Sequence, residues 1–194
     1  LDAKVGLTNN LTLDLTINPD FGQVEADPSE VNLSAFESYF QEKRMFFIEG
    51  RNIYSFPLRL GDGRDAKDNL FYSRRIGRRP SYSPDSYSYI DSPKNTSILG
   101  AAKITGRTKN GISIGILESV TNHEQARYTD GSNSIKDINV EPLTNYFVAR
   151  IEKDFNKGNT KIGGMITSTN RKIAEDHLKI LPKAAYTGGI NIEH

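Results

Sequence analysis

The feature that most constrains the fold is a two-residue alternation of apolar and polar side chains around a tight turn between residues 95 and 122. The turn is Thr108–Gly111, and it ends in Asn-Gly, a pair that tolerates the positive φ angles of a short β-hairpin. Side chains of a strand point alternately to opposite faces, so this pattern predicts two antiparallel strands with one apolar face. The predicted apolar face, interrupted by Glu118, holds Ile98, Gly100, Ala102, Ile104, Ile112, Ile114, Ile116 and Val120.

The same design recurs at both ends of the chain. Residues 1–18 alternate around a turn at Asn9-Asn10, and residues 147–167 alternate around a turn at residues 156–159. A last strand begins at Ala184. In the first strand of the hairpin over residues 147–167, one predicted face carries Phe147, Ala149, Ile151 and Phe155, and the other carries Arg150, Glu152 and Asp154. The chain is therefore predicted to be all-β with antiparallel, up-and-down strands and a short helix.

The helix is expected inside a long insertion over residues 19–94. Asp27 suits the N-cap, Pro28 the first helical position and Glu30 the third, while Leu33, Phe36 and Phe40 recur at helical spacing. We therefore predict a short helix over about residues 28–40. The run Met45–Ile48 and residues 69–76 are predicted as short strands, and residues 122–142 and 170–183 as polar connections.

Connection lengths alternate along the chain, and this bears on the architecture. Short turns separate the strands of each hairpin, whereas long connections separate the hairpins, which is the pattern of an outer-membrane β-barrel. A soluble β-sandwich is the alternative, because it also uses alternating strands. The first residue is Leu, and the last residues resemble the middle of a strand. We therefore interpret residues 1–194 as a fragment of one barrel domain, with a hairpin at 1–18, the insertion at 19–94 and hairpins at 95–194.

Composition excludes several classes of function. The net charge is +1, which gives no reason to expect nucleic acid as a partner, and there is no Cys for thiolate metal sites or cysteine nucleophiles. Gly111–Gly115 matches the G-x-S-x-G pattern, but Ser113 lies in an alternating strand rather than a strand-to-helix turn. The three histidines, His123, His177 and His194, lack metal-ligand spacing. We therefore assign no catalytic residue, metal ligand or cofactor.

Two neighbouring clusters are candidates for ligand binding. Basic side chains at residues 74–79 have the chemistry to grip phosphate or an acidic sugar, and the tyrosines of the next segment have the flat rings on which sugars stack. A solvated basic row followed by an exposed loop is the alternative interpretation. The candidate ligand-binding residues are Arg74, Arg75, Arg78, Tyr82, Tyr87 and Tyr89.

Several stretches of the chain resemble one known family. The sequence LTLDLTINPDFGQVEADP over residues 11–28 is the most specific of them, and the others lie at residues 31–37, 42–50, 70–78, 98–106 and 140–148. Together they resemble the domain-of-unknown-function family 5916 of Gram-negative bacteria. Where that family usually has Pro after Lys-Arg, this chain has Met45.

The resemblance implies an outer-membrane β-barrel portion of a larger protein, in contact with outer-membrane lipid. In that family a module similar to family-9 carbohydrate-binding domains lies upstream, so polysaccharide or oligosaccharide is the implied partner, in glycan binding or uptake. Some members are labelled membrane-associated hydrolases, and the family supplies no catalytic residues to carry over. Two alternatives stay open: a soluble carbohydrate-binding β-domain, and a glycan hydrolase whose acids lie in the long loops, at Glu25, Asp27, Glu37 or Glu49.

Overall fold

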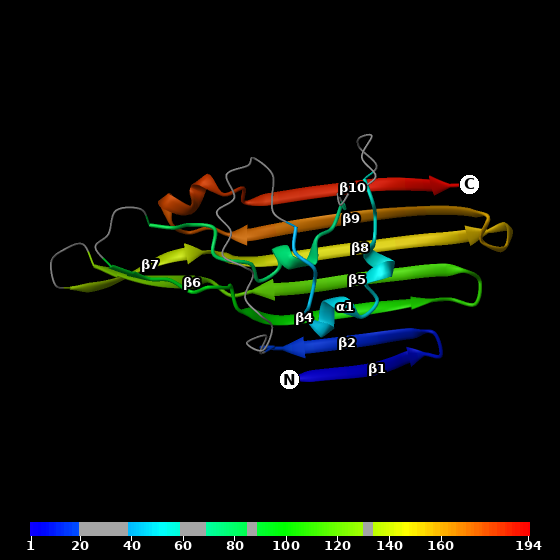
Figure 1. Ribbon diagram of the computed structural model, residues 1–194, viewed down its shortest axis with the longest axis horizontal. Coiled ribbons are helices and arrows are strands. Elements are labelled where there is room, and N and C mark those ends of the chain that lie inside the picture. The colour runs from blue at the N-terminus through cyan, green and yellow to red at the C-terminus, as the bar shows by residue number, and fades with distance from the viewer. Residues whose placement is uncertain (20–38, 59–68, 85–88, 130–133) are drawn as a thin grey trace.

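The computed structural model describes residues 1–19, 39–58, 69–84, 89–129 and 134–194, which form antiparallel β-sheets with one short α-helix (Figure 1). The strands are β1 (Asp2–Thr8), β2 (Leu11–Ile17), β3 (Tyr89–Asp91), β4 (Ile98–Arg107), β5 (Ile112–Thr121), β6 (Glu124–Thr129), β7 (Ile135–Glu141), β8 (Leu143–Phe155), β9 (Thr160–Lys172) and β10 (Ala184–Glu193). The helical segments are α1 (Met45–Ile48) and the 3-10 turns η1 (Arg51–Tyr54), η2 (Ser73–Arg75), η3 (Asn156–Gly158) and η4 (Asp176–Ile180). The predicted all-β, antiparallel class is confirmed.

The main sheet is a seven-stranded meander in the order β1-β2-β4-β5-β8-β9-β10. Every neighbouring pair is antiparallel, and the three predicted hairpins pair as β1 with β2, β4 with β5 and β8 with β9. Gly111 adopts a φ of 75° in the β4–β5 turn, as the Asn-Gly signal predicts. The turns of all three hairpins lie at the same end of the sheet (Figure 1). Short connections are therefore gathered at one rim.

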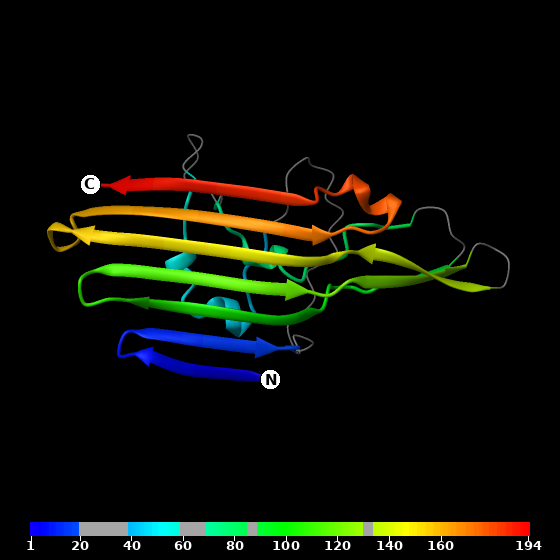
Figure 2. The same ribbon diagram turned by 180° about the vertical axis from the view of Figure 1, so that it is seen from behind.

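The second sheet corrects the prediction of a polar loop over residues 122–142. β6 and β7 form an antiparallel ribbon there, and β3 adds a third strand along β6. The ribbon continues β5 and β8 beyond the end of the main sheet opposite the hairpin turns (Figure 2). Only Ala126 and the β7 residues from Val140 onward are fully covered, so the polar composition reflects a ribbon that is largely solvated on both faces.

Three predicted elements differ in the structure. Met45–Ile48 is the helix α1 rather than a strand, because the Arg44 carbonyl accepts hydrogen bonds from the amides of Phe47 and Ile48. Residues 69–76 hold a single bridge at Asn69 and then η2 instead of a strand. The sequence did not distinguish these possibilities for Met45–Ile48, because four apolar residues in a row carry no periodicity that separates a helical turn from a strand. The predicted connection over 170–183 contains the end of β9 and η4. The predicted helix over residues 28–40 falls almost entirely outside the described residues, and Tyr39 and Phe40 are not helical.

The insertion covers one face of the main sheet. In Figure 1, α1 and the segments around it lie in front of β4, β5 and β8. Aromatic and aliphatic side chains of the insertion pack there against side chains of the strands. This core consists of Phe47, Tyr54, Phe56 and Ile76 from the insertion and Ile98, Ala101, Leu117, Val148 and Met165 from the sheet. Ile98 belongs to it because a register shift before Gly100 turns its side chain away from the predicted apolar face.

The two faces of the sheet differ in what they bury and expose. Beside the apolar core, the covered face buries the charged residues Asp14, Lys103 and Arg150, which are 7%, 1% and 7% exposed. The opposite face leaves large apolar side chains uncovered, with Ile151, Ile166 and Ile190 exposed by 56%, 57% and 81%. One apolar row on this face crosses the strands through Val5, Leu13, Ile104, Ile116, Ala149 and Ile166. Among the described residues, no helix or loop lies over this face (Figure 2).

Candidate functional site

A buried lysine joins the insertion to the sheet. The Lys103 ammonium donates hydrogen bonds to the carbonyl oxygens of Phe46 and Glu49, the latter at 2.9 Å. It lies 3.5 Å from the Asp14 carboxylate and 4.7 Å from the centre of the Phe46 ring. Burial lowers the pKa of Lys103, against the opposing attraction of Asp14. The α1 turn is thus held on β2 and β4 by a charge that has no contact with bulk water.

A second ion pair joins the two parts of the insertion. The Arg44 guanidinium binds both oxygens of Glu42, at 2.8 and 2.7 Å, and donates to the carbonyls of Ser73 and Ile76. The Ser73 hydroxyl donates to Glu42 at 2.6 Å. Burial raises the pKa of Glu42, but the hydrogen bonds and charge of Arg44 outweigh it, so the pKa lies below its ordinary value of 4.5. The fork of Arg44 therefore fixes residues 42–47 against residues 73–76.

The third anchor is Tyr54 in η1. Its hydroxyl donates to the carbonyl of Ile116 at 2.9 Å, and burial raises the pKa of this phenol. Close approach requires Gly115 beneath it, because a Cβ at that position would lie 2.7 Å from Ile53 and 2.9 Å from Tyr54. Because Gly115 has no side chain, η1 can pack directly against the backbone of β5.

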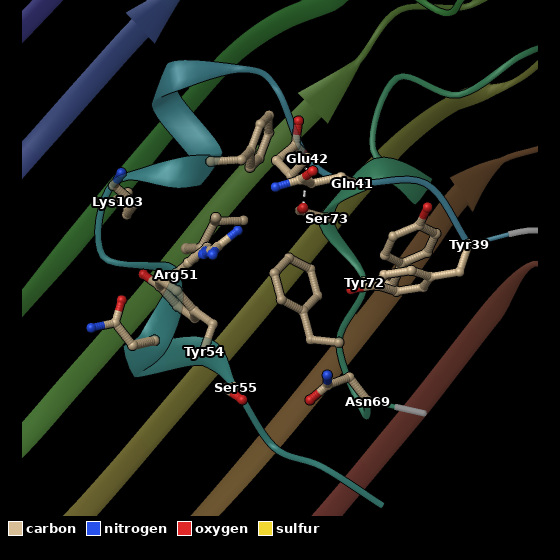
Figure 3. A pocket seen from close by; sticks show the side chains of 14 residues that line it. Tyr39, Gln41, Glu42, Arg51, Tyr54, Ser55, Asn69, Tyr72, Ser73 and Lys103 are labelled. Carbon is tan, nitrogen blue, oxygen red and sulfur yellow. Dashed lines mark hydrogen bonds between the residues drawn. The ribbon is translucent and has the colours of Figure 1, made fainter. Parts of the chain in front are cut away.

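These anchors enclose a cavity of about 550 Å³ between the insertion and the sheet (Figure 3). This volume is in the range of small-molecule sites, roughly 300–1,000 Å³. Tyr39 and Tyr72 stack at its edge with ring centres 4.6 Å apart. The aromatic lining is Tyr39, Phe47, Tyr54, Phe71 and Tyr72, and the remaining lining is Gln41, Glu42, Arg51, Asn52, Ser55, Asn69, Ser73, Lys103 and Leu117.

The polar groups of the lining fall into two sets. Glu42, Ser73 and Lys103 are engaged in the anchors described above, and Asn69 accepts a hydrogen bond from the Phe56 amide at 2.9 Å. By contrast, the side chains of Gln41, Arg51, Asn52 and Ser55 form no hydrogen bond or ion pair in the part of the chain that the structure describes. The second set offers amide, hydroxyl and guanidinium groups to a ligand.

None of the three basic residues predicted from the sequence lines this cavity, although Arg74 and Arg75 contact residues that do. Arg74 and Arg75 follow the lining residue Ser73 in η2. Arg74 donates to the Gln41 carbonyl at 3.4 Å, and burial lowers its pKa. Arg75 lies 6.0 Å from the centre of the Tyr72 ring, and Arg78 donates to the Ser81 hydroxyl at 2.8 Å.

The predicted tyrosines lie elsewhere. Tyr82 packs against His177 of η4, with ring centres 4.8 Å apart, and its amide donates to the Val140 carbonyl. Tyr89 begins β3 and pairs with Thr129, whereas Tyr87 lies outside the described residues. Tyr82 thus contacts η4 and β7, while Arg78 binds the adjacent Ser81. Ligand binding by the six predicted residues stays a prediction.

Sequence reasoning missed the cavity residues. Most of them lie between Tyr39 and Ser55, where aromatic side chains alternate irregularly with polar ones. That mixture of rings and hydrogen-bonding groups was a usable signal, but it has no periodicity and no motif. Only the close packing of residues 39–55 on residues 69–73 brings these groups together.

The hydrolase alternative named four acidic residues, and of these only Glu49 lies in the described part of the chain. Glu49 pairs with Lys4 at 2.5 Å, and that hydrogen bond lowers the pKa of its carboxyl, so the group is ionised rather than poised as an acid. Glu25, Asp27 and Glu37 lie outside the described residues. Within the described ranges, no group of three or more His, Asp or Glu side chains is arranged to hold a metal ion.

The fold and the site together define an antiparallel meander that carries its own folded insertion on a charged face. The family model "Domain of unknown function (DUF5916)" matches residues 1–176, and the chain belongs to that family. This confirms the family resemblance seen in the sequence. No curated protein and no solved structure matches the chain. In the described ranges, no helix is both long enough and apolar enough to cross a membrane.

Proposed function

We propose that the chain forms part of the lipid-facing wall of an outer-membrane β-barrel, with its insertion folded against the inner face. One observation carries the proposal: the sheet leaves a face of large apolar side chains exposed, while its covered face buries charged groups beside the apolar core. Ile151 and Ile166 are more than half exposed, whereas Lys103 is buried. Burial of polar groups away from lipid, with apolar groups outward, is the arrangement that a bilayer demands of a strand.

The dimensions of the strands support the same proposal. Of the main sheet, β4, β5 and β10 have 10 residues each and β8 and β9 have 13, whereas β1 and β2 have 7. A tilted strand needs roughly 9–11 residues to cross the hydrocarbon core. The hairpin turns at one rim and the β6–β7 ribbon and η4 at the other match the short and long connections of such barrels.

A soluble β-sandwich accounts less well for these contacts. In a sandwich, the apolar faces of two sheets pack against each other and the polar faces meet water. Here the packed face holds the Asp14–Lys103 pair beside the apolar core, and a second apolar face is left without a packing partner among the described residues. The insertion therefore takes the place of a plug rather than of a second sheet.

Within this larger protein, we propose that the wall serves the binding or uptake of glycan. The cavity on the inner face supports this role, because aromatic rings with nearby amides and hydroxyls are suited to the apolar faces and hydroxyls of sugars. The family's upstream carbohydrate-binding module, expected from the sequence resemblance, would deliver the same class of ligand. A hydrolytic role has no comparable support.

Labelling of single cysteines tests the membrane placement, since the chain has no native Cys. In outer membranes holding the full-length protein, Cys at Ile151 should react with a lipid-soluble maleimide and resist a water-soluble one. Cys at Ser113, which lies on the opposite face in the neighbouring strand, should show the reverse preference. Rapid reaction of the Ile151 variant with the water-soluble reagent, or protection from both reagents, would rule out lipid contact at this face.

A further inference from the structure

We propose that the cavity on the inner face binds a carboxylated sugar, with Arg51 as the group that binds the carboxylate. This deepens the glycan role and rests on it for the sugar class, but it does not depend on the membrane placement. It also differs from the sequence prediction, in which the basic cluster at residues 74–78 was the candidate for acidic ligands.

Arg51 is distinguished by the absence of a partner. Among the described arginines, only Arg51 and Arg79 form no hydrogen bond, ion pair or ring contact, and only Arg51 lines the cavity. Its five N–H donors are therefore available, in the planar fork that matches a carboxylate. Two other charges of the lining are already balanced, Lys103 by Asp14 at 3.5 Å and Glu42 by the bidentate contact of Arg44. Arg51 is therefore the charge on the lining that no described group balances.

The backbone holds Arg51 at the cavity. Gly50 adopts a φ of 70°, and a Cβ there would lie 3.0 Å from Thr105 of β4. This left-handed residue turns the chain from α1 into η1, so that Arg51 follows directly at the cavity wall. In Figure 3, Arg51 and Tyr54 lie on one side of the cavity, and Tyr39 and Tyr72 lie on the other.

The remaining lining matches a sugar better than an aromatic acid. The stacked pair Tyr39–Tyr72 offers a flat surface, which either kind of ring accepts. Asn52, Ser55 and Gln41, however, offer donors and acceptors that have no partner among the described residues. These three residues are exposed to solvent. Hydroxyls both donate and accept, so a hydroxylated ring forms hydrogen bonds with them in place of water, whereas a plain aryl carboxylate has no hydroxyls to offer.

Calorimetric titration of the purified full-length protein in detergent tests the assignment with three probes: D-glucuronate, D-glucose and benzoate. We expect glucuronate to bind more tightly than glucose and benzoate. Arg51→Gln should weaken glucuronate binding by roughly tenfold or more, because a charge-assisted hydrogen-bonded pair is lost, and should weaken glucose binding much less, because glucose has no carboxylate. Arg51→Lys should restore part of the loss, since the charge remains without the fork.

Two further variants complete the experiment. Arg79→Gln removes the other unpartnered arginine, away from the cavity, and should leave glucuronate binding unchanged. Tyr39→Ala removes one ring of the stack and should weaken glucuronate and glucose alike. This variant reports on the cavity even if the Arg51 variants fold poorly.

Wild-type affinity of Arg51→Gln for glucuronate, or equal affinity of the wild type for glucose and glucuronate, would overturn the role of Arg51. Benzoate binding as tightly as glucuronate would overturn the sugar assignment, and no binding of any probe would overturn the site. None of these outcomes alters the maleimide pattern at Ile151, so failure of this inference is distinguishable from failure of the membrane proposal. Glucose binding with no preference for glucuronate would leave the glycan role standing.

Discussion

Lys103 and Asp14 face each other across the register of β4 and β2, with the ammonium 3.5 Å from the carboxylate on the face that the insertion covers. Neither side chain is more than 10% exposed. The pair lies beside Phe46, which packs against the apolar core on this face. It therefore contributes to the contact that holds the insertion on the sheet.

Removal of one member of this pair should be strongly destabilising. Lys103→Met leaves Asp14 with only the more exposed Lys4, at 3.6 Å, and leaves the carbonyls of Phe46 and Glu49 without this donor. We expect the free energy of unfolding to fall by about 3 kcal/mol. The double variant Lys103→Met with Asp14→Leu should recover most of the loss, because an apolar pair has no charge to desolvate. Denaturant unfolding in detergent, followed by circular dichroism, measures both.

The exposed pair Asp176–Lys179, with side chains 91% and 68% exposed, supplies the control. Its removal by Asp176→Asn should change the free energy of unfolding by less than about 1 kcal/mol. A loss for Lys103→Met no larger than that of this control would show that the buried pair does not hold the insertion.

The ion pair of Glu42 and Arg44 predicts a pH-dependent contribution to stability. The folded-state pKa of Glu42 lies below the ordinary value of 4.5, so its contribution is fully present above that value and is lost as the pH falls through the folded pKa. Glu42→Gln should therefore be much less stable than the wild type at about pH 7, and the difference should shrink towards about pH 3. Denaturant unfolding at both pH values tests this, and a difference independent of pH would contradict the assignment.

Gly115 lies where η1 packs against β5, so a larger residue at this position should clash with η1. A methyl group there would lie 2.7 Å from Ile53, so Gly115→Ala should cost about 1–3 kcal/mol of unfolding free energy through displacement of η1. Gly164→Ala is the matched control, because its Cβ would lie 3.6 Å from the nearest atom, on the exposed face. Equal stability of the two variants would mean that η1 does not require close contact with β5.

Ile166 and Thr167 are adjacent in β9, and their side chains point to opposite faces of the sheet. Comparing lysine variants at the two positions therefore tests whether the apolar face meets lipid or water. If the apolar face meets the hydrocarbon core, Ile166→Lys should cost about 2–4 kcal/mol of folding free energy in vesicles, and Thr167→Lys much less. Refolding of the full-length protein into vesicles at increasing denaturant measures this difference. If Ile166 instead faces water, its lysine variant should fold as well as the wild type.

Much of the strand pattern followed from the sequence because a two-residue period is a local property. To predict the turns at Asn9-Asn10 and Thr108–Gly111, it was enough to find Asn and Gly in a short polar segment. To predict the strands on either side, it was enough to find alternating apolar and polar residues. The faces of β5, β8 and β9 were predicted residue by residue for the same reason. β6 and β7 escaped prediction because a ribbon solvated on both faces has weak alternation.

Only the tertiary structure decided which face of the sheet is covered. Alternation places Ile151 and Arg150 on opposite faces, but it does not say which of them meets protein. That choice depends on contacts between residues far apart in the chain, such as Lys103 with Glu49 and Tyr54 with Ile116. The cavity has the same origin: Arg51 and Tyr72 share no local pattern, and they line one space because buried ion pairs and hydrogen bonds hold the insertion on the sheet.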